Sequence, residues 1–406
     1  MFEFAKTFFS IIGDSNVNKQ QQKKLYFVCG NEAADLDSII AATVYSYLSQ
    51  QLIAPNESTT SSLYFPIIQI PRSDLYLRPE CSYVFNQCNF SALDISQLLF
   101  LDDVSPHLNQ LSSKNYDVNL ILVDHNKLIS PWDEKFNDKI VAILDHHSDE
   151  KLYPYLNDKC RQIETVGSAT SLVVLHFKND WEKKISRDDD ENSWYAKLAK
   201  LLLAPILVDT ILLDESKNRV TNKDREATQF LLNVLKIPIS TRENFTSKYF
   251  EEIQNVKLDV THFSNIDLLR KDYKEWDLNT YKIGVSSVYW FLEGWINRED
   301  DDINKLIDSF KSFSIKMKLD IFIIMMAYNH KDKGFKREFV FLSKDDKDNI
   351  FIRDKFTQQL EKKLQLKRKS LTTNVDHIKF YNQEDNSISR KQLFPLVNEL
   401  IFTTNL

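Results

Sequence analysis

Four short segments in the first half of the chain carry acids or histidines of the kinds that bind metal ions. They are GNEAADLDS (30–38), LVDHN (122–126), LDHHSDE (144–150) and ILVDT (206–210). Carboxylates that converge repel one another and raise their own pKa values, and divalent cations relieve this repulsion. Mixed carboxylate and imidazole ligands suit Mn²⁺, Mg²⁺ or Co²⁺. Two such ions about 3.5–4 Å apart can hold a bridging hydroxide as a nucleophile.

The acids of these segments are placed where they can converge. Asp35 and Asp37 are two residues apart, in the turn between the first expected strand and the helix that follows it. Asp124 and Asp145 end two further strands. Asp209 interrupts a strongly apolar helix, where a lone charge is costly unless it is paired or bound to a metal.

The pair His146 and His147 follows directly on a strand. Neighbouring side chains on a strand point in different directions, so the two imidazoles need not share a task. We expect one histidine to bind metal and the other to reach the substrate. Asp145 can then hold the other ring nitrogen of the ligand histidine, or a nearby backbone group.

Each of these features, taken singly, has a simpler structural explanation. Asp37 is well placed to cap a helix. A buried carboxylate such as Asp209 is commonly satisfied within the core, and a pair of histidines after a strand usually belongs to a surface loop. The convergence of all four segments on one edge of a sheet nevertheless favours a functional site.

Apolar strands alternate with helices in the first half of the chain, which predicts a parallel sheet covered on both faces. The expected strands are 24–29, 61–70, 98–102, 119–124 and 139–145. The expected helices are the N-terminal stretch 1–16, 37–52, 170–181, 194–213 and 223–237. Three of the strands end on an acid, namely Asp102, Asp124 and Asp145. Sites in open α/β sheets form just beyond the C-terminal ends of strands, so these carboxylates are candidates as a set.

The second half of the chain has a different order of expected strands and helices. Its expected strands are 281–291, 319–329, 337–343 and 376–382, with helices at 302–313 and 352–365. We therefore predict an α/β protein of two domains. Residues 1–237 form a mostly parallel sheet with helices on both faces, 238–262 form a linker, and 263–406 form a smaller α/β domain with a mixed sheet.

Composition narrows the class of protein. No run of eighteen apolar residues would span a membrane. The four cysteines have no zinc-binding spacing, which favours a reducing, cytoplasmic setting. The net charge of −6 argues against a nucleic-acid coat protein, although residues 331–406 carry a balance of +5. A basic C-terminal end suits contact with a polyanion, and random surface variation explains it equally well.

At these residues the chain resembles the DHH phosphoesterase superfamily, whose motif lies here at 145–147. Within it, the chain is similar to the fungal exopolyphosphatases and to the related family II inorganic pyrophosphatases. The second half resembles the DHHA2 domain, with LLRKDYKEW (268–276) near its start and SRKQLFPL (389–396) near its end. QIPRSDLYLRPE (69–80) resembles the exopolyphosphatase branch. The resemblance covers most of the chain, and the joint order of the motifs is more specific than any one of them.

Carried over residue by residue, the resemblance implies a site for two divalent cations (Mn²⁺, Mg²⁺ or Co²⁺). The implied ligands are Asp35, Asp37, Asp124, His146 and Asp209. His147 would face the substrate phosphate, with Gly167 and Ser168 lining the site. The implied catalytic residues are Asp124, His146 and His147. The implied phosphate-binding residues of the second domain are Lys274, Arg390 and Lys391.

One position departs from the pyrophosphatase pattern. That group has a histidine where this chain has Asn31, a weaker and neutral ligand, and we place Asn31 at the substrate. The same form occurs in the exopolyphosphatase branch and in the animal prune proteins. Prune-like chains lack the second histidine of the DHH motif, whereas His147 is present here, which favours full hydrolytic competence.

We therefore expect an exopolyphosphatase that removes terminal orthophosphate from linear polyphosphate by in-line attack of a metal-bound hydroxide. Closure of the second domain would complete the site. The alternatives are an inorganic pyrophosphatase, an oligonucleotide phosphodiesterase with aromatic stacking near the metals, and a prune-like binding protein. We expect inorganic polyphosphate as the partner, no nucleic acid and no membrane, and a monomer.

Overall fold

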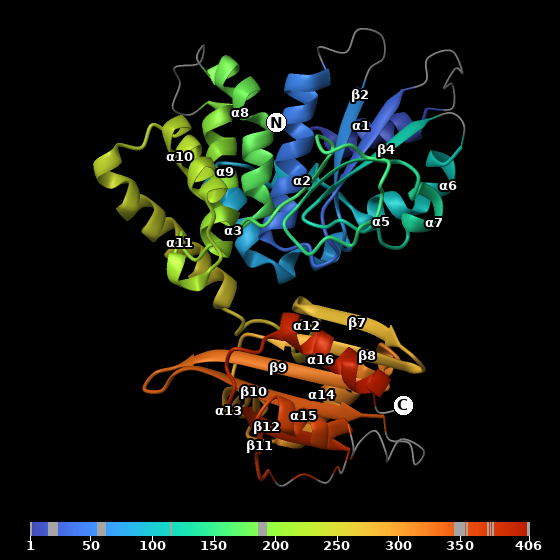
Figure 1. Cartoon of the computed structure of the whole chain (residues 1–406), viewed down its shortest axis with the longest axis vertical. Helices are drawn as coiled ribbons and strands as arrows, with labels where there is room; N and C mark the ends of the chain where they lie inside the picture. Colours follow the sequence, from blue (N-terminus) through green and yellow to red (C-terminus); the bar gives the residue numbers. More distant parts are fainter. Residues whose placement is uncertain are drawn as a thin grey trace. The chain divides into compact units, whose positions relative to one another are not determined.

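The computed structural model describes residues 2–14, 23–54, 62–113, 116–185, 193–344, 354, 356–371, 373, 375 and 377–403. The chain divides into two compact units, Met1–Lys257 and Leu258–Leu406. Each unit has its own six-stranded sheet and its own hydrophobic core (Figure 1).

The sheet of the first unit is parallel throughout, in the order β3-β2-β1-β4-β5-β6. Its strands are β1 (Lys24–Cys29), β2 (Ser62–Ile68), β3 (Leu99–Phe100), β4 (Asp117–Val123), β5 (Ile140–Asp145) and β6 (Arg161–Ile163). Successive strands are added outward on one side of β1 and then, from β4 onward, on the other side. The order therefore reverses between β1 and β4, and the loops that leave these two strands border the crevice where ligands bind in such sheets.

Helices pack around this sheet. They are α1 (Phe4–Ile12), α2 (Leu36–Leu48), α3 (Pro79–Gln87), α4 (Ala92–Ser96), α5 (Leu101–Val104), α6 (Leu108–Leu111), α7 (Asp133–Phe136), α8 (Ala169–Ile185), α9 (Trp194–Asp209), α10 (Asn222–Val234) and α11 (Arg242–Leu258). Shorter turns are η1 (Ser49–Ile53), η3 (Arg72–Leu77), η4 (Ser105–His107), η5 (Glu215–Lys217) and η6 (Ile239–Thr241). Helix α2 contacts β1, β2, β4, α8 and α9, so its residues are buried almost all round. This burial explains why its sequence lacks a polar face.

The N-terminal stretch is a helix, as predicted. Phe8 of α1 is fully buried, and its ring packs edge-on against Phe27 of β1 and Phe65 of β2. These aromatic contacts attach the helix to the body of the unit.

Three predictions for the first unit need correction. Strand β3 has only two residues, and Asp102 lies in α5, where a side-chain oxygen accepts the backbone N–H of Arg72 at 3.0 Å. Through this bond Asp102 holds the start of η3. Helix α9 ends at Asp209 and does not continue to 213. Strand β6 was not predicted because its three residues, RQI, carry only one apolar side chain.

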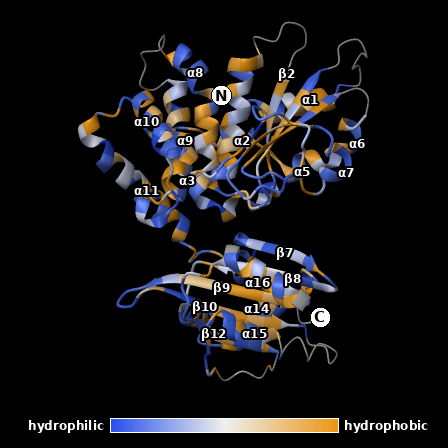
Figure 2. Cartoon of the chain, in the orientation of Figure 1, coloured by the Kyte–Doolittle hydropathy of each residue, from blue (hydrophilic) through white to orange (hydrophobic). Residues whose placement is uncertain are grey.

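The second unit has a mixed sheet in the order β11-β12-β10-β9-β8-β7, in which only β8 and β9 run parallel. Its strands are β7 (Tyr273–Leu278), β8 (Tyr281–Val288), β9 (Ile321–His330), β10 (Gly334–Ser343), β11 (Leu366–Arg368) and β12 (Ile378–Gln383). Its helices are α12 (Asn265–Lys271), α13 (Leu292–Arg298), α14 (Ile303–Lys316), α15 (Thr357–Lys363) and α16 (Arg390–Thr403). Figure 2 shows that β9 and β10 are mostly hydrophobic, as expected for central strands. The edge strands β7 and β11, rich in charged residues, were not predicted.

The fold class is confirmed: a parallel α/β sheet in the first unit and a smaller mixed sheet in the second. The segment 238–262, expected as an irregular linker, instead contains α11. Tyr249 and Ile253, one helical turn apart, are both buried, and the Tyr249 hydroxyl donates to the carbonyl of Lys200 at 3.3 Å. This single short stripe was too weak to predict a helix. Among the described helices, none is both long and apolar enough to cross a membrane.

Candidate metal centre

The loop that leaves β1 is shaped by Asn31, which is buried with 7% of its surface exposed. Its side-chain oxygen accepts the backbone N–H groups of Ala33 and Ala34 at 2.9 and 3.1 Å. Its amide nitrogen donates to Oδ2 of Asp124 at 2.8 Å. Asn31 therefore folds its own loop and holds the carboxylate of the neighbouring strand. Both ends of its amide are used, so Asn31 is not available as a metal ligand.

Arg78 supports the same loop from outside. It is buried with 7% exposed, and its guanidinium donates to the carbonyls of Ala33 and Ala34 at 2.5 and 3.2 Å. The loop residues between Asn31 and Asp35 are thus held from both sides. The segment 69–80 was singled out by resemblance, but the spacing of its residues gave no sign of this task.

Asp35 and Asp37 each cap a helix, but different ones. Asp35 is the N-cap of α2 and accepts the N–H of Ser38 at 3.0 Å. Asp37, 3% exposed, accepts four hydrogen bonds from the start of α8: the Ser168 hydroxyl at 2.7 Å, the Ala169 N–H at 2.7 Å, and the N–H and hydroxyl of Thr170 at 2.9 and 2.5 Å. Three of these bonds reach Oδ1, and Oδ2 accepts only that of Ala169. A lone pair on Oδ2 therefore remains for a cation.

Gly167 lets the loop before α8 approach the end of α9. A Cβ atom at this position would lie 2.4 Å from Cγ2 of Thr210 and 2.5 Å from the carbonyl oxygen of Arg219. Its N–H donates to Asp224 at 2.9 Å. Any larger residue would push the start of α8, which donates hydrogen bonds to Asp37, away from the end of α9, which carries Asp209.

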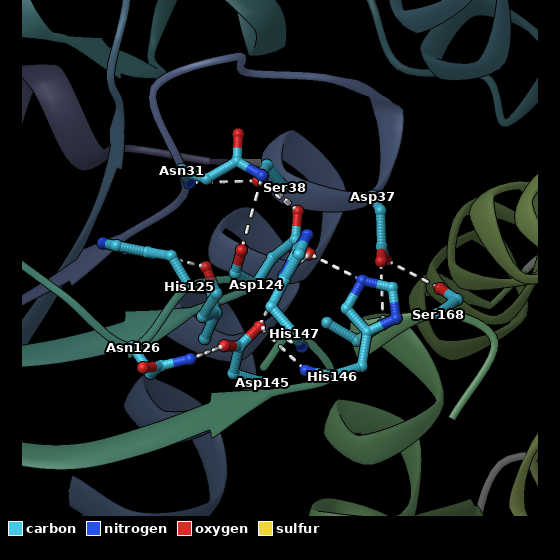
Figure 3. A network of polar contacts seen from close by, with 12 residues as sticks. Asn31, Asp37, Ser38, Asp124, His125, Asn126, Asp145, His146, His147 and Ser168 are labelled. Carbon is cyan, nitrogen blue, oxygen red and sulfur yellow. Dashed lines mark hydrogen bonds and ion pairs between the residues drawn. The ribbon is translucent and has the colours of Figure 1, made fainter. Parts of the chain in front are cut away.

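Asp124 directly follows β4 and is the most constrained of the acids. Its backbone is left-handed, with φ of 63°, and its side chain is buried with 1% exposed. Oδ2 accepts the amide of Asn31 and the hydroxyl of Ser38, the latter at 2.6 Å. Oδ1 has no hydrogen-bond donor, and Nε2 of His146 faces it at 3.1 Å, as Figure 3 shows. A buried carboxylate oxygen without a donor is costly unless a cation occupies the position in front of it.

The two histidines after β5 are oriented by different groups. Nδ1 of His146 lies 3.0 Å from the carbonyl oxygen of Val166, which can only accept, so Nδ1 carries the proton and Nε2 is turned toward Asp124. Nδ1 of His147 lies 2.8 Å from Oδ1 of Asp145. The two rings are nearly perpendicular, at 81°. The divergence predicted for neighbouring histidines is thus observed.

Asp145 is fully buried and organises this turn. Its Oδ1 accepts the backbone N–H groups of His146 and His147 at 2.8 and 3.2 Å, and its Oδ2 accepts the amide of Asn126 at 2.5 Å. Burial opposes ionisation, but the hydrogen bonds from His147 and Asn126 outweigh it and lower the pKa of Asp145 to about 2. We expected Asp145 to hold either the ring of the metal-binding histidine or a nearby backbone group, and it holds the backbone N–H groups. The imidazole ring that it contacts is that of His147, whereas the carbonyl of Val166 contacts the ring of His146.

Asp209 is the last residue of α9, and after the helix cap Thr210 the three residues 211–213 are left-handed with φ of 52°, 61° and 58°. Such backbone is unfavourable for branched residues, and it turns the chain sharply away from the helix. Burial and the negative charges of Asp37 and Asp35 raise the pKa of Asp209 well above its ordinary value. The positive charge of Lys257 opposes this shift.

The acids and His146 act on one another electrostatically. Burial, followed by the charges of Asp37 and Asp35, raises the pKa of Asp124 to about 7. Burial disfavours the charged form of His146, but the adjacent carboxylate of Asp124 and the charge of Asp37 prevail and raise its pKa to about 10. The structure thus brings Asp124, His146 and His147 together, with ligand atoms within 4.8 Å of one another. Asp37 and Asp35 are close enough to raise the pKa of Asp124, and the charge of Asp124 contributes in turn to the raised pKa of Asp209.

The remaining candidates lie in the second unit. Arg390 begins α16, and its guanidinium forms an ion pair with Asp272 at 2.6 Å. Lys274 lies on the edge strand β7. The side chain of Lys391 lies outside the described part of the chain.

The donor set suits divalent cations. The group that the structure brings together, Asp124, His146 and His147, offers a carboxylate oxygen and two imidazole nitrogens without thiolates, and the carboxylate keeps one oxygen buried without a donor. The residues that hold these groups in place are Asn31, Ser38, Arg78, Asn126, Val166 and Thr170. Sequence patterns could not reveal them in this role, because they act through backbone groups or across long separations in the chain.

The fold and site define a two-domain α/β protein with a carboxylate and imidazole centre at the switch point of a parallel sheet. Family comparison agrees with this class. Residues 26–206 match the DHH family, N-terminal domain, and residues 251–400 match the DHHA2 domain. The chain belongs to the DHH family, which confirms the resemblance found in the sequence.

Relatives of this family span most of the chain. A Schizosaccharomyces pombe protein described as "Putative exopolyphosphatase" is 30% identical over 92% of this chain and 90% of its own length. "Exopolyphosphatase PRUNE1" of Homo sapiens is 24% identical over 94% of this chain and 77% of its own length. The crystal structure of a Methanococcus jannaschii "putative family II inorganic pyrophosphatase" has a TM-score of 0.53 and 20% identity, and covers 93% of this chain and 99% of its own. This last likeness concerns the fold alone.

Proposed function

We propose that this protein is an exopolyphosphatase, which hydrolyses the terminal phosphoanhydride bond of linear inorganic polyphosphate. The observation that carries the proposal is the buried Oδ1 of Asp124, which lacks a donor and faces Nε2 of His146. The S. pombe relative, which matches this chain over 90% of its own length and is described as "Putative exopolyphosphatase", supports polyphosphate as the substrate.

The ligands that we propose for two divalent cations are Asp35, Asp37, Asp124, His146 and Asp209. Manganese is one candidate, since a related inorganic pyrophosphatase of Methanocaldococcus jannaschii is described as manganese-dependent. Metal ions bound there supply a nucleophile by lowering the pKa of a bound water, and they neutralise charge on the phosphate.

The protein's own groups then orient the reaction. Asn31 and Ser38 fix one oxygen of Asp124, which leaves the other toward the cation. The Val166 carbonyl keeps the proton of neutral His146 on Nδ1, so that Nε2 presents its lone pair.

His147 is placed to bind substrate. Its side chain is 41% exposed, and the ionised Asp145 holds Nδ1. Nε2 is therefore the ring atom that faces outward, and in the imidazolium form it donates to a phosphate oxygen.

Lys274, Arg390 and Lys391 are proposed to bind further phosphate groups. An arginine fork offers two parallel hydrogen bonds to a phosphate, and a lysine offers a point charge. In the structure Arg390 is paired with Asp272, so a phosphate would compete with that carboxylate.

Asn31 bears on the main alternative, an inorganic pyrophosphatase. Where the resemblance places a histidine ligand in that group, Asn31 spends its amide on Asp124 and on its own loop. The centre therefore has one ligand fewer than the pyrophosphatase pattern implies, which favours the exopolyphosphatase.

The test is release of orthophosphate by the purified full-length protein with Mg²⁺, Mn²⁺ or Co²⁺. Pyrophosphate, tripolyphosphate and long-chain polyphosphate are compared side by side, and the remaining chains are sized on a gel. We expect release from the two longer substrates, with orthophosphate as the released product. Preference for pyrophosphate would identify the protein as an inorganic pyrophosphatase. If no phosphate is released with any of the three metals, the protein would be a binding protein without hydrolytic activity.

A further inference from the structure

The second unit contains a cavity at the end of the β9–β10 hairpin, separate from the residues discussed so far. Its volume is about 730 Å³, and the hairpin, β12 and the start of α13 form its walls. Its lining combines two aromatic rings, four lysines, Arg337 and several amide side chains. Figure 2 shows the hairpin end as hydrophilic, in contrast to the apolar strands behind it.

The aromatic wall is formed by Phe291 and Tyr328. Their ring centroids lie 5.4 Å apart, with an angle of 38° between the planes. Phe291 is 37% exposed, an unusual state for such a side chain. Its ring lies against Gly294, where a Cβ atom would come within 2.5 Å of it. The ring is thus held in place by the start of α13 and keeps part of its surface open.

The cationic wall is formed by Lys331, Lys333 and Lys336, which line the cavity. None of the three forms an ion pair within the part of the chain that the structure describes, although Asp332 and Glu293 also line the cavity. Two other acids that line the cavity already have partners. Glu338 pairs with Lys369 and accepts the N–H of Leu292 at 2.6 Å. Glu384 pairs with Lys367 at 3.4 Å.

These two walls together indicate the chemistry of the ligand. A phosphate chain would use the lysines but has no use for exposed aromatic rings. A base stacks on such rings, and the amides of Asn329 and Asn382 offer both donors and acceptors to its edge. We propose that this cavity binds a nucleoside oligophosphate, with the base on Phe291 and Tyr328 and the phosphates on the three lysines. This inference goes beyond the proposed function and does not depend on it.

The test measures binding of ATP, inorganic tripolyphosphate and adenosine to the full-length protein by calorimetry, in EDTA and without divalent cations, so that the metal centre cannot hydrolyse the ligands. ATP should bind about tenfold more tightly than tripolyphosphate, since stacking contributes on that order. Phe291→Ala should remove this difference. Phe335→Ala is the matched control, because Phe335 is equally exposed at 37% but does not line the cavity.

A second pair of variants tests the lysines. Lys331→Ser with Lys333→Ser should weaken ATP about tenfold or more at low salt. The control, Lys316→Ser with Lys362→Ser, removes two exposed lysines elsewhere in the same unit and should leave binding unchanged. Asp124→Asn should also leave it unchanged, which separates the cavity from the metal centre.

Three outcomes would overturn the proposal. Equal affinity for ATP and tripolyphosphate, unaffected by Phe291→Ala, would define a site for phosphate chains alone. ATP binding that disappears only in Asp124→Asn would place the nucleotide at the metal centre. Absence of ATP binding at millimolar concentration would show that the cavity has no such ligand. None of these results depends on whether the protein hydrolyses polyphosphate.

Discussion

Asp124→Asn isolates the role that we assign to the donor-free oxygen. Asparagine has the same shape as aspartate, and its oxygen can still accept from Asn31 and Ser38. Its amide nitrogen then takes the place of Oδ1, 3.1 Å from Nε2 of His146, and can donate to it. The substitution also removes a buried charge that Asp37 and Asp35 disfavour. We therefore expect the metal-free variant to fold and to melt within a few degrees of the parent.

Metal binding should respond in the opposite way. Removal of a group that only orients a metal ligand weakens metal affinity about 10–100-fold. Asp124 is proposed as a ligand itself, so Asp124→Asn should weaken metal affinity by at least about 100-fold. At a metal concentration 100 times the parent's dissociation constant, binding stabilises the parent by about 2.7 kcal/mol. At the same concentration a variant with 100-fold weaker binding gains only about 0.4 kcal/mol.

The assay is a pair of thermal melts, with and without Mn²⁺, together with phosphate release from tripolyphosphate. The parent should show a clear metal-induced rise in melting temperature and the variant almost none. Turnover of the variant should fall at least about 100-fold, or about 2.7 kcal/mol in the barrier. Asp94→Asn is the matched control, because Asp94 is also buried but caps α4. A variant with the parent's metal-induced shift and turnover would refute the assignment of Asp124.

Four further predictions concern other groups. Arg78→Met should weaken metal affinity about tenfold while circular dichroism stays unchanged, because the loop carrying Asp35 loses two hydrogen bonds; unchanged affinity would contradict this. The pKa of His146 is raised to about 10, so a proton must leave when metal binds, and affinity should rise about tenfold per pH unit between 6 and 8; calorimetry showing no pH dependence would exclude it. Arg390→Ala should raise KM for polyphosphate more strongly at low salt; an effect independent of salt would indicate a packing role. A thiol reagent should modify only Cys160 in the native protein, since the other three cysteines are buried, and all four after unfolding; rapid reaction of a second thiol would disagree.

Much of the fold could be read from the sequence because the periodic signals were strong. Continuous apolar strands such as 24–29 and 139–145 have few alternatives to a parallel sheet. The predictions failed where the local signal was short or polar. β6 has three residues, β7 and β11 are charged edge strands, and α11 shows only Tyr249 and Ile253 as a buried stripe.

The candidate site shows the same division. The acids and histidines were found because their types and their places after strands are visible in the chain. Their division of labour was not visible. Asp37 engages the start of α8 more than 130 residues away, and Val166 orients His146 through a backbone carbonyl that any residue possesses.

The sequence by itself determined which chemical groups are available and that parallel strands would deliver several of them to one edge of a sheet. Only the tertiary structure decided that Asp124 keeps an oxygen free while Asn31 and Ser38 occupy the other, and that Asp145 orients His147. The physical reason is that hydrogen-bond partners are set by distance and direction in space, whereas periodicity reports only which residues are buried.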